Sequence, residues 1–369
     1  MSSNVAVLMP DEALMRGPVL GRLAIGLLVP MSGVMGVAGP SIINCALLAA
    51  EEYARFSGNG TDLILIDAGQ PPMAVSRAVN NLVASNLVHV LVGTHTSNVR
   101  VAVEQNLGNR VPYIFTPPHE ADVSLVSSWG TMFLGQNPEL QLRQPLSWLS
   151  QNRAVTRWAL IGNDYVWPRK VHLAARKILR ELDQSVVMDE MVPINQVDAE
   201  YLIDKAKRAH ADAILVSLVG RDGISFHRAV RDLGADNSFI RLCTALDENC
   251  LVAAGGDETG NLYSAMPTFM NQKDEKHQRL IELYVQRFGL SAPLPGTYAE
   301  GCYRGLHFAA ALASSGLLRQ KSNIDALRLL NRVTTQTWEN PLFMVDAMDS
   351  LARMARAEGN ELEVVGTFR

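Results

Sequence analysis

Two short polar segments contain the side chains best suited to chemistry. Val92–Ser97 has the sequence Val-Gly-Thr-His-Thr-Ser, and Phe115–Glu120 has the sequence Phe-Thr-Pro-Pro-His-Glu. The imidazoles of His95 and His119 and the carboxylate of Glu120 could exchange protons with a substrate. Hydroxyls and backbone amides of the same segments could instead hold a carbonyl or carboxylate oxygen. The two segments therefore leave open an acid–base enzyme and a protein that binds a small polar solute.

The usual catalytic and metal-binding motifs are absent from the sequence. It contains no GxSxG, no HExxH and no CxxC pair, and its eight histidines lack the spacing of metal ligands. The turn Gly33–Gly39 has the spacing GxxGxxG without a following Lys-Ser/Thr, which favours a helix entry over a nucleotide site. We therefore predict no catalytic residue, no metal and no cofactor. The four cysteines are interpreted as buried thiols: Cys45, Cys243, Cys250 and Cys302.

Three further segments follow predicted strands in the second half of the chain. Gly162–Arg169 places Tyr165 and Trp167 in a predicted loop, and the segments 218–221 and 244–248 are short and polar. Trp167 could contact a solute or could act as a hydrophobic staple at a helix start, and both interpretations stay open. Open α/β sheets bind ligands at the carboxyl ends of their strands, so all of these segments are candidates for a binding pocket.

Short apolar runs alternate with amphipathic stretches from residue 23 onward, which is typical of parallel strands joined by crossover helices. In the first half the pattern predicts strands at residues 24–29, 62–67, 88–92 and 111–115 and helices at 40–56, 73–85 and 97–107. In the second half it predicts strands at 157–161, 185–191, 213–218 and 239–243 and helices at 139–150, 169–182, 199–208 and 224–233. The pattern changes after residues 263–266, and helices at 273–288, 298–314 and 324–333 and short strands at 342–346, 351–357 and 362–365 complete the chain. The predicted fold is α/β, with two doubly wound parallel-sheet lobes.

The predicted lobes are not separated by a low-complexity linker. We therefore expect about three hinge crossings of the chain, near residues 136–138, 266–269 and 340–343, and a ligand cleft between the lobes. The predicted division consists of an N-terminal extension at 1–21, a first lobe at 22–137 plus 268–340, and a second lobe at 138–267 plus 341–369.

Composition and charge exclude several protein classes. The 369 residues are 48% hydrophobic and 19% charged, which fits a folded globular protein of about two domains. A net charge of −4 provides no electrostatic footprint for direct binding of nucleic acid.

No apolar run reaches the roughly 18 residues of a membrane span, and the run Val5–Met9 ends at Pro10 without a basic leader region. We expect a cytoplasmic protein, or a periplasmic one if a leader peptide precedes this sequence.

From residue 22 onward the chain resembles the type I periplasmic-binding-protein family, in its leucine/isoleucine/valine-binding group. Ile25–Gly33 (IGLLVPMSG), the segment ending at Ser97 and the C-terminal strands fall in the family's order. Ile161–Arg169 (IGNDYVWPR) looks most like the branch that binds urea and short-chain amides, which typically carries GSDY followed by an aromatic residue, Pro and Arg. That branch includes exported ABC-transporter receptors and a cytoplasmic amide sensor that holds an antiterminator inactive until amide binds.

The resemblance implies ligand-binding roles for residues of both lobes. Ser97, which is also predicted as a helix N-cap, matches the branch's ligand-binding serine. Tyr165 matches its pocket tyrosine, Trp167 takes the place of a second aromatic residue, and 115–118 matches the segment that holds the ligand amide. The predicted ligand-binding residues are Ser97, His95, Thr96, Phe115, Thr116, Pro117, Pro118, His119, Tyr165, Trp167 and Asp247.

Three positions depart from the branch. It usually carries an aromatic residue at the position of His95 and tyrosines at those of Phe115 and His119. Two hydroxyls are thereby lost and two imidazoles gained, so the solute is expected to be larger or more acidic than acetamide or urea. Asp247 lies near the acidic residue that holds the amino group in amino-acid receptors.

The resemblance predicts a non-catalytic protein that binds a small polar organic solute of amide, urea or amino-acid type. The main expectation is a cytoplasmic amide sensor that acts as a negative regulator through an antiterminator-type partner. The alternative is an ABC-transporter receptor for amides, urea or branched-chain amino acids, with an ABC permease as its partner. An amide-hydrolysing enzyme is the alternative of another class, and a homo-oligomer is an option under each function.

Overall fold

The computed structural model describes residues 4–108, 110–120, 131–316, 318 and 351–368, and its chain divides into two compact units. Unit 1 consists of Met1–Gly33, Gly39–Gly135 and Glu282–Met348, and unit 2 consists of Val34–Ala38, Gln136–Ile281 and Asp349–Arg369. This division assigns residues 268–281 to unit 2, whereas the sequence pattern placed them in the first lobe. None of the described helices is long and apolar enough to span a membrane.

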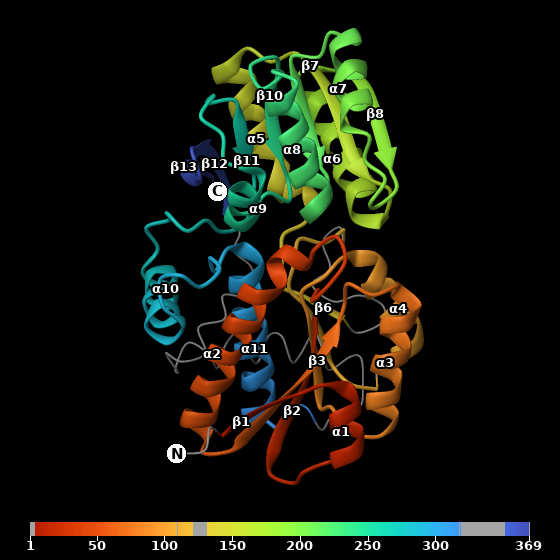
Figure 1. Cartoon of the computed structure of the whole chain (residues 1–369), viewed down its shortest axis with the longest axis vertical. Helices are drawn as coiled ribbons and strands as arrows, with labels where there is room; N and C mark the ends of the chain where they lie inside the picture. The colour runs from red at the N-terminus through yellow and green to blue at the C-terminus, as the bar shows by residue number, and fades with distance from the viewer. Residues whose placement is uncertain (1–3, 109, 121–130, 317, 319–350, 369) are drawn as a thin grey trace. The chain divides into compact units, whose positions relative to one another are not determined.

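A six-stranded parallel sheet forms the centre of unit 1 (Figure 1). Its order is β1-β3-β2-β4-β5-β6, and its strands are β1 (Val5–Leu8), β2 (Arg22–Val29), β3 (Gly60–Asp67), β4 (Val90–Gly93), β5 (Tyr113–Phe115) and β6 (Thr131–Phe133). β3 and β4 flank β2, because Ile25 is aligned with Leu63 on one side and with Val90 on the other. The strand order therefore reverses at β2, which makes the carboxyl ends of β2 and β4 a topological switch point.

Helices cover both faces of this sheet (Figure 1). α2 (Gly39–Ser57) packs against α11 (Thr297–Ser314), and α3 (Pro72–Ala84) packs against α4 (Ser97–Leu107). β2 is buried along nearly its whole length, as expected for a parallel strand covered on both sides. Two further helices are α1 (Pro10–Arg16), which contacts β3 and α3, and α10 (Glu275–Phe288), which contains the boundary between the units.

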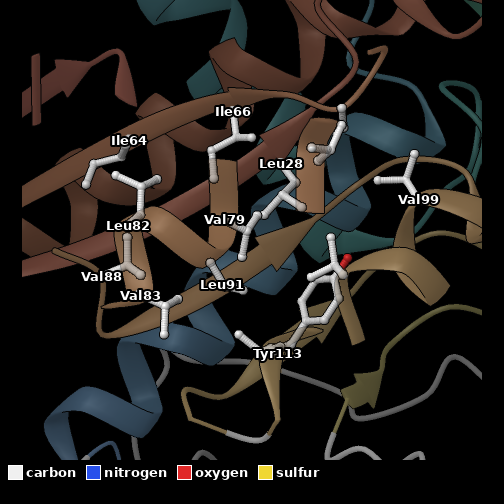
Figure 2. Packing of buried hydrophobic residues seen from close by; sticks show 14 of the residues in the cluster. Leu28, Ile64, Ile66, Val79, Leu82, Val83, Val88, Leu91, Val99 and Tyr113 are labelled. Atoms are coloured by element: carbon white, nitrogen blue, oxygen red, sulfur yellow. The ribbon is translucent and has the colours of Figure 1, made fainter. Parts of the chain in front are cut away.

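Figure 2 shows the apolar cluster that joins the sheet of unit 1 to α3 and α4. Its members are 5% exposed or less and include Leu28, Ile64, Ile66, Val79, Leu82, Val83, Val88, Leu91, Val99 and Tyr113. Full burial of one such aliphatic side chain stabilises a fold by roughly 1.5–3 kcal/mol. This cluster therefore holds β4 against α3 and α4.

A seven-stranded sheet forms the centre of unit 2. Its order is β13-β12-β11-β10-β9-β7-β8, and its strands are β7 (Arg157–Asn163), β8 (Ser185–Val192), β9 (Ala213–Ser217), β10 (Ile240–Cys243), β11 (Leu262–Ser264), β12 (Ala352–Glu358) and β13 (Glu361–Phe368). β7 to β11 are parallel, and β12 is antiparallel to both of its neighbours. β8 and β9 flank β7, so the strand order of unit 2 reverses at β7.

The helices of unit 2 pack in two groups. α5 (Pro138–Arg153) contacts α6 (Val166–Glu181), whereas α8 (Gly220–Asp232) contacts α7 (Ala199–Arg208) and α9 (Glu248–Ala254). The short 3-10 helix η1 (Gly36–Ala38), which follows β2 in the chain, contacts α8 and α9 and belongs to unit 2.

The predicted doubly wound lobes are confirmed, and the elements missed by sequence analysis are short. α1 and α9 have seven residues each and β6 has three, so none of them contains enough residues for a periodic pattern. The segment expected to be an N-terminal extension contributes β1, which pairs with β3. The predicted helix at 324–333 and strand at 342–346 lie outside the described residues.

Gly220, the first residue of α8, allows a close backbone approach that other residues would obstruct. Its φ is +47°, and a Cβ atom there would lie 2.1 Å from the carbonyl oxygen of Val34. That oxygen accepts a hydrogen bond of 2.8 Å from the Arg221 amide, which ties the residues before η1 to α8.

We predict that Gly220→Ala lowers the free energy of unfolding by about 2–4 kcal/mol, because backbone strain adds to a steric clash. Gly234→Ala is the matched control, because Gly234 has a φ of +61° and a Cβ atom there would meet open space out to 4 Å. The free energy of unfolding of the control should fall by only about 1–2 kcal/mol, which is the cost of a positive φ for alanine. Urea unfolding of both variants measures the difference, and equal losses would contradict the close approach.

Candidate functional site

The segment after β4 contains residues predicted to bind the ligand, and it leads into the first turn of α4. Thr96 is the N-cap residue, with extended φ and ψ of −72° and 149°, and Ser97 is the first helical residue. The prediction of Ser97 as the N-cap is therefore wrong by one position, because the backbone becomes helical one residue earlier. Ser97 is only 2% exposed and lies next to the first-turn amides of α4, at the switch point of unit 1.

His95 is held by contacts inside unit 1. Its Nδ1 lies 3.0 Å from the Thr96 carbonyl oxygen and its Nε2 lies 2.7 Å from the Tyr113 hydroxyl. The ring also makes an edge contact with Phe115, at 5.3 Å between ring centroids. Burial, together with the nearby charge of Arg100, lowers the pKa of His95 to about 4. His95 is therefore a neutral side chain near pH 7, and both of its ring nitrogens have protein partners.

The segment after β5 contributes mainly backbone and one hydroxyl. Phe115 has no exposed surface and belongs to the apolar cluster. The Thr116 hydroxyl lies 2.7 Å from the Thr94 hydroxyl and 3.3 Å from the Gly93 carbonyl oxygen, so it links β5 to the end of β4. Pro117 and Pro118 are buried. A ligand-binding role of these four residues, 115–118, stays a prediction, and their burial limits it to the backbone and Thr116.

Arg100 is a buried cation beside the predicted site residue His119. Arg100 forms ion pairs with Glu104 and Glu120 and lies 5.3 Å from the centroid of the Phe133 ring. His119 stacks on the same ring at 4.5 Å. Burial, followed by a smaller effect of the Arg100 charge, lowers the pKa of His119 to about 4. The sequence pattern did not single out Arg100, because Glu120 and Phe133 are distant from it in the chain.

Asp67, at the end of β3, holds the glycine-rich turn that follows β2. Its Oδ1 accepts hydrogen bonds from the amides of Met31, Ser32 and Gly69 at 2.9, 3.1 and 2.9 Å. Burial raises the pKa of Asp67. These bonds, together with hydrogen bonds from the side chains of Ser32 and Gln70, outweigh the effect of burial, so the pKa of Asp67 lies below its ordinary value. The amides of Met31 and Ser32, which lead into the turn, are thus bound by a carboxylate, which agrees with a helix entry rather than a phosphate site.

In unit 2, the segment after β7 positions the two predicted aromatic residues at the start of α6. Tyr165 is the N-cap residue of α6 and is 8% exposed. Burial raises the pKa of its hydroxyl well above the usual value. Trp167 lies within the first helical turn and is 4% exposed. The expectation of a loop at Trp167 is wrong, because α6 begins three residues earlier than predicted, and Pro168 is tolerated in a first helical turn.

A buried amide–carboxylate pair supports this segment. The Asn163 Nδ2 donates to Asp222 Oδ2 at 2.7 Å, and the Val219 amide donates to Asn163 Oδ1 at 2.9 Å. The Asn195 amide also donates to Asp222 Oδ2, at 2.9 Å. These bonds join the carboxyl ends of β7 and β9 to the loop after β8. Sequence analysis missed Asp222, because its burial at the first turn of α8 is a signal that only a structure provides.

The acidic candidate Asp247 acts as a helix cap. It is the N-cap residue of α9, and its Oδ1 accepts a hydrogen bond of 2.9 Å from the Cys250 amide. Burial raises the pKa of Asp247, and burial also raises the pKa of the adjacent Glu248 to about 7. Glu248 accepts a bond of 2.7 Å from the Met270 amide. A direct role of Asp247 in binding an amino group stays a prediction.

The neighbouring thiol of Cys243 and imidazole of His227 do not form an activated pair. Cys243 Sγ lies 3.3 Å from His227 Nε2 in the interior of unit 2. Burial raises the pKa of Cys243 to about 12 and lowers that of His227 to about 3. Both groups are therefore neutral near pH 7, whereas a cysteine nucleophile needs a thiolate. All four cysteines are free and buried, which confirms their interpretation as buried thiols.

The side chains that could ligate a metal are scattered. In the described part of the chain, no group of three or more His, Cys, Asp or Glu side chains could hold a metal ion. The candidate site consists of hydroxyls, backbone amides and aromatic rings at the strand ends of each unit.

Comparison with known protein structures identifies the fold. The chain is similar to the leucine-binding protein LivK of Thermotoga maritima, with a TM-score of 0.79 at 14% identity over 94% of this chain and 99% of that chain. It is also similar to LivJ of Streptococcus pneumoniae in complex with isoleucine, with a TM-score of 0.76 at 19% identity over 93% and 99% of the two chains. A solute binding protein of an ABC transporter from R. palustris, in complex with 4-hydroxybenzoate, has a TM-score of 0.77 at 16% identity over 94% and 97%. At these identities the likeness shows the fold.

Sequence comparison identifies the family. The Leu/Ile/Val-binding protein BraC3 of Rhizobium johnstonii is 22% identical over 223 residues, which is 59% of this chain and only 60% of that relative's length. The family model described as "Periplasmic binding protein" matches residues 22–357. The chain therefore belongs to the periplasmic binding protein family, with the type I fold of its leucine/isoleucine/valine-binding group.

Proposed function

We propose that this protein is the solute-binding receptor of an ABC-type transporter and that its solute is a small molecule with a carboxylate group. The observation that carries the proposal is Ser97 in the first turn of α4, where a hydroxyl and backbone amides meet at a topological switch point. Structural relatives described as solute-binding proteins support this class of solute, because they are complexes with isoleucine, benzoate or 4-hydroxybenzoate.

The charges around α4 favour recognition by dipoles rather than by a free cation. The charge of Arg100 is compensated by Glu104 and Glu120. The imidazoles of His95 and His119, each with a pKa of about 4, are uncharged near pH 7. The positive end of the α4 dipole is therefore the feature that we expect to balance the carboxylate.

Tyr165 is the contact that we propose from unit 2. It is an aromatic side chain at the start of α6, just after the carboxyl end of β7. The strand order of unit 2 reverses at β7, so this end of the strand is the switch point of that unit. An aromatic ring would suit the apolar part of an amino acid or an aromatic acid. Trp167, in the same first turn, is a second candidate for this contact.

A cytoplasmic amide sensor is the second candidate function. The segment Ile161–Arg169, which resembles the amide-binding branch, is the observation that favours it. In this case the bound solute would change a contact with a regulatory protein, and a permease would not be involved. Stabilisation by acetamide or urea but not by amino or aromatic acids would support this candidate.

Catalysis is not part of the proposed function. Known members of the group are described as solute-binding or substrate-binding proteins. The acid–base alternative would require His95 or His119 to exchange protons near pH 7, whereas both have a pKa of about 4. Release of ammonia from a bound amide above the rate of a protein-free control would contradict this assignment.

A thermal-shift screen against isoleucine, benzoate, 4-hydroxybenzoate, acetamide and urea would test the proposed function. A solute present at 100 times its Kd should stabilise the protein by about 2.7 kcal/mol. We predict that Ser97→Ala and Tyr165→Ala each weaken the best solute's affinity by about tenfold, since each removes roughly 1.4 kcal/mol of binding free energy.

Two control variants separate binding from stability in these measurements. Ser76→Ala removes another buried serine, whose hydroxyl bonds the Ala102 carbonyl oxygen, and Tyr201→Ala removes an exposed tyrosine of α7. Calorimetry should give both controls the wild-type affinity. Wild-type affinity in both Ser97→Ala and Tyr165→Ala would contradict the proposed contacts.

The low pKa values of His95 and His119 predict a specific pH dependence. Both values, about 4, lie below the ordinary value of 6.5, so the two side chains stabilise the fold above pH 6.5 and this contribution is lost as pH falls toward 4. Solute affinity should therefore be equal at pH 8 and pH 6, while urea unfolding should show a loss of stability between pH 6 and pH 4. An affinity that rises several-fold from pH 8 to pH 6 would instead indicate a charged imidazole at the solute.

A further inference from the structure

Residues 4–21 precede the family match, which begins at residue 22, and they are folded onto unit 1. β1 pairs in parallel with β3, from Val5 opposite Thr61 to Leu8 opposite Ile64. At the other end of this segment, Asp62 pairs with Arg16 and accepts a hydrogen bond of 2.7 Å from Arg22 Nε. The segment is thus an ordered addition to the side of the family's sheet.

This addition carries an unusual share of the exposed large hydrophobic side chains. The large hydrophobic side chains that are exposed among the described residues number fourteen, and six of them lie between residues 7 and 20. Val7 lies on the other face of the sheet, because its neighbour Leu8 packs with Ala13 of α1 in the apolar cluster. We name the other five side chains the N-terminal patch: Met9, Leu14, Met15, Val19 and Leu20. Met15 is 82% exposed and Leu20 is 99% exposed, whereas Ala13 on the opposite side of α1 is 1% exposed. Exposed apolar side chains that are concentrated in one short segment favour an interaction site, while single ones are ordinary.

The two ends of α1 differ in charge. Asp11 and Glu12 are exposed in its first turn, which gives two negative charges there. At its last turn Arg16 and Arg22 surround one carboxylate, that of Asp62, which leaves one net positive charge. A surface with an apolar centre and opposite charges at its two ends is complementary to itself after a rotation of 180°.

We propose that the N-terminal patch is the contact between two copies of this chain, related by a two-fold axis that sets the two α1 helices antiparallel. In this arrangement the apolar side chains of one copy cover those of the other. The acidic first turn of each α1 lies near the Arg16 and Arg22 pair of the partner. The self-complementary charges favour a second copy over a lipid surface, because membrane-surface helices depend on a Lys- and Arg-rich polar face.

The association state of the full chain tests the proposal. Sedimentation velocity over an about hundredfold range of concentration should give a dimer that dissociates on dilution, since a subunit contact obeys mass action. Leu20→Glu and Met15→Glu should each weaken dimerisation by at least about tenfold, because each buries a charge in an apolar contact. Asp11→Lys should weaken it as well, by placing like charges near the partner's arginines.

Leu290→Glu is the matched control, because Leu290 is 88% exposed and lies outside the N-terminal patch. It should dimerise like the wild type. Circular dichroism of every variant should be unchanged, since the substituted side chains are exposed. A monomeric wild type, including one that instead sediments with lipid vesicles, would overturn the proposal, as would equal dimerisation of Leu20→Glu and Leu290→Glu. Neither measurement depends on the identity of the solute, so the result is independent of the proposed function.

Discussion

The reversal of strand order at the central strand of each sheet is the constraint on which the rest of the structure depends. Parallel strands on either side of β2, and likewise of β7, send their connections to opposite faces of the sheet. The loops after β2 and β4, and those after β7 and β9, must therefore separate from each other. The contacts proposed above, Ser97, Tyr165 and Trp167, lie on one of these loops or on the helix that follows it.

Loops that separate in this way leave backbone amides without partners in a strand, and two buried or half-buried carboxylates satisfy them. Asp67 binds three amides around the turn after β2, and Asp222 binds Asn163 and the Asn195 amide beside β7. An unpaired amide in a protein interior is costly, so these side chains stabilise loop conformations that the backbone alone would not keep. The conformations of the loop after β2 and of the loop after β7 therefore depend on the carboxylates of Asp67 and Asp222.

Desolvation determines which charges are available near these loops. The ion pairs of Arg100 compensate its positive charge, and burial keeps the nearby imidazoles neutral. A buried charge without such compensation would be strongly unfavourable. Recognition in unit 1 is consequently left to hydroxyls, backbone amides and a helix dipole, which suits a small polar solute better than proton transfer.

The sequence by itself determined the architecture and most element positions. Alternating apolar runs predict the two doubly wound sheets, and the helices at 97–107 and 199–208 have the predicted bounds, because long periodic patterns reflect local burial. The motifs around Ser97 and Tyr165 likewise led to the family without any structure. The tertiary structure alone decided the roles of Arg100, Asp67 and Asp222, each of which binds a residue 20 or more positions away along the chain. It also decided that Asp247 caps a seven-residue helix and that residues 4–21 extend a sheet, because pairing and burial depend on contacts between distant segments, which no local pattern encodes.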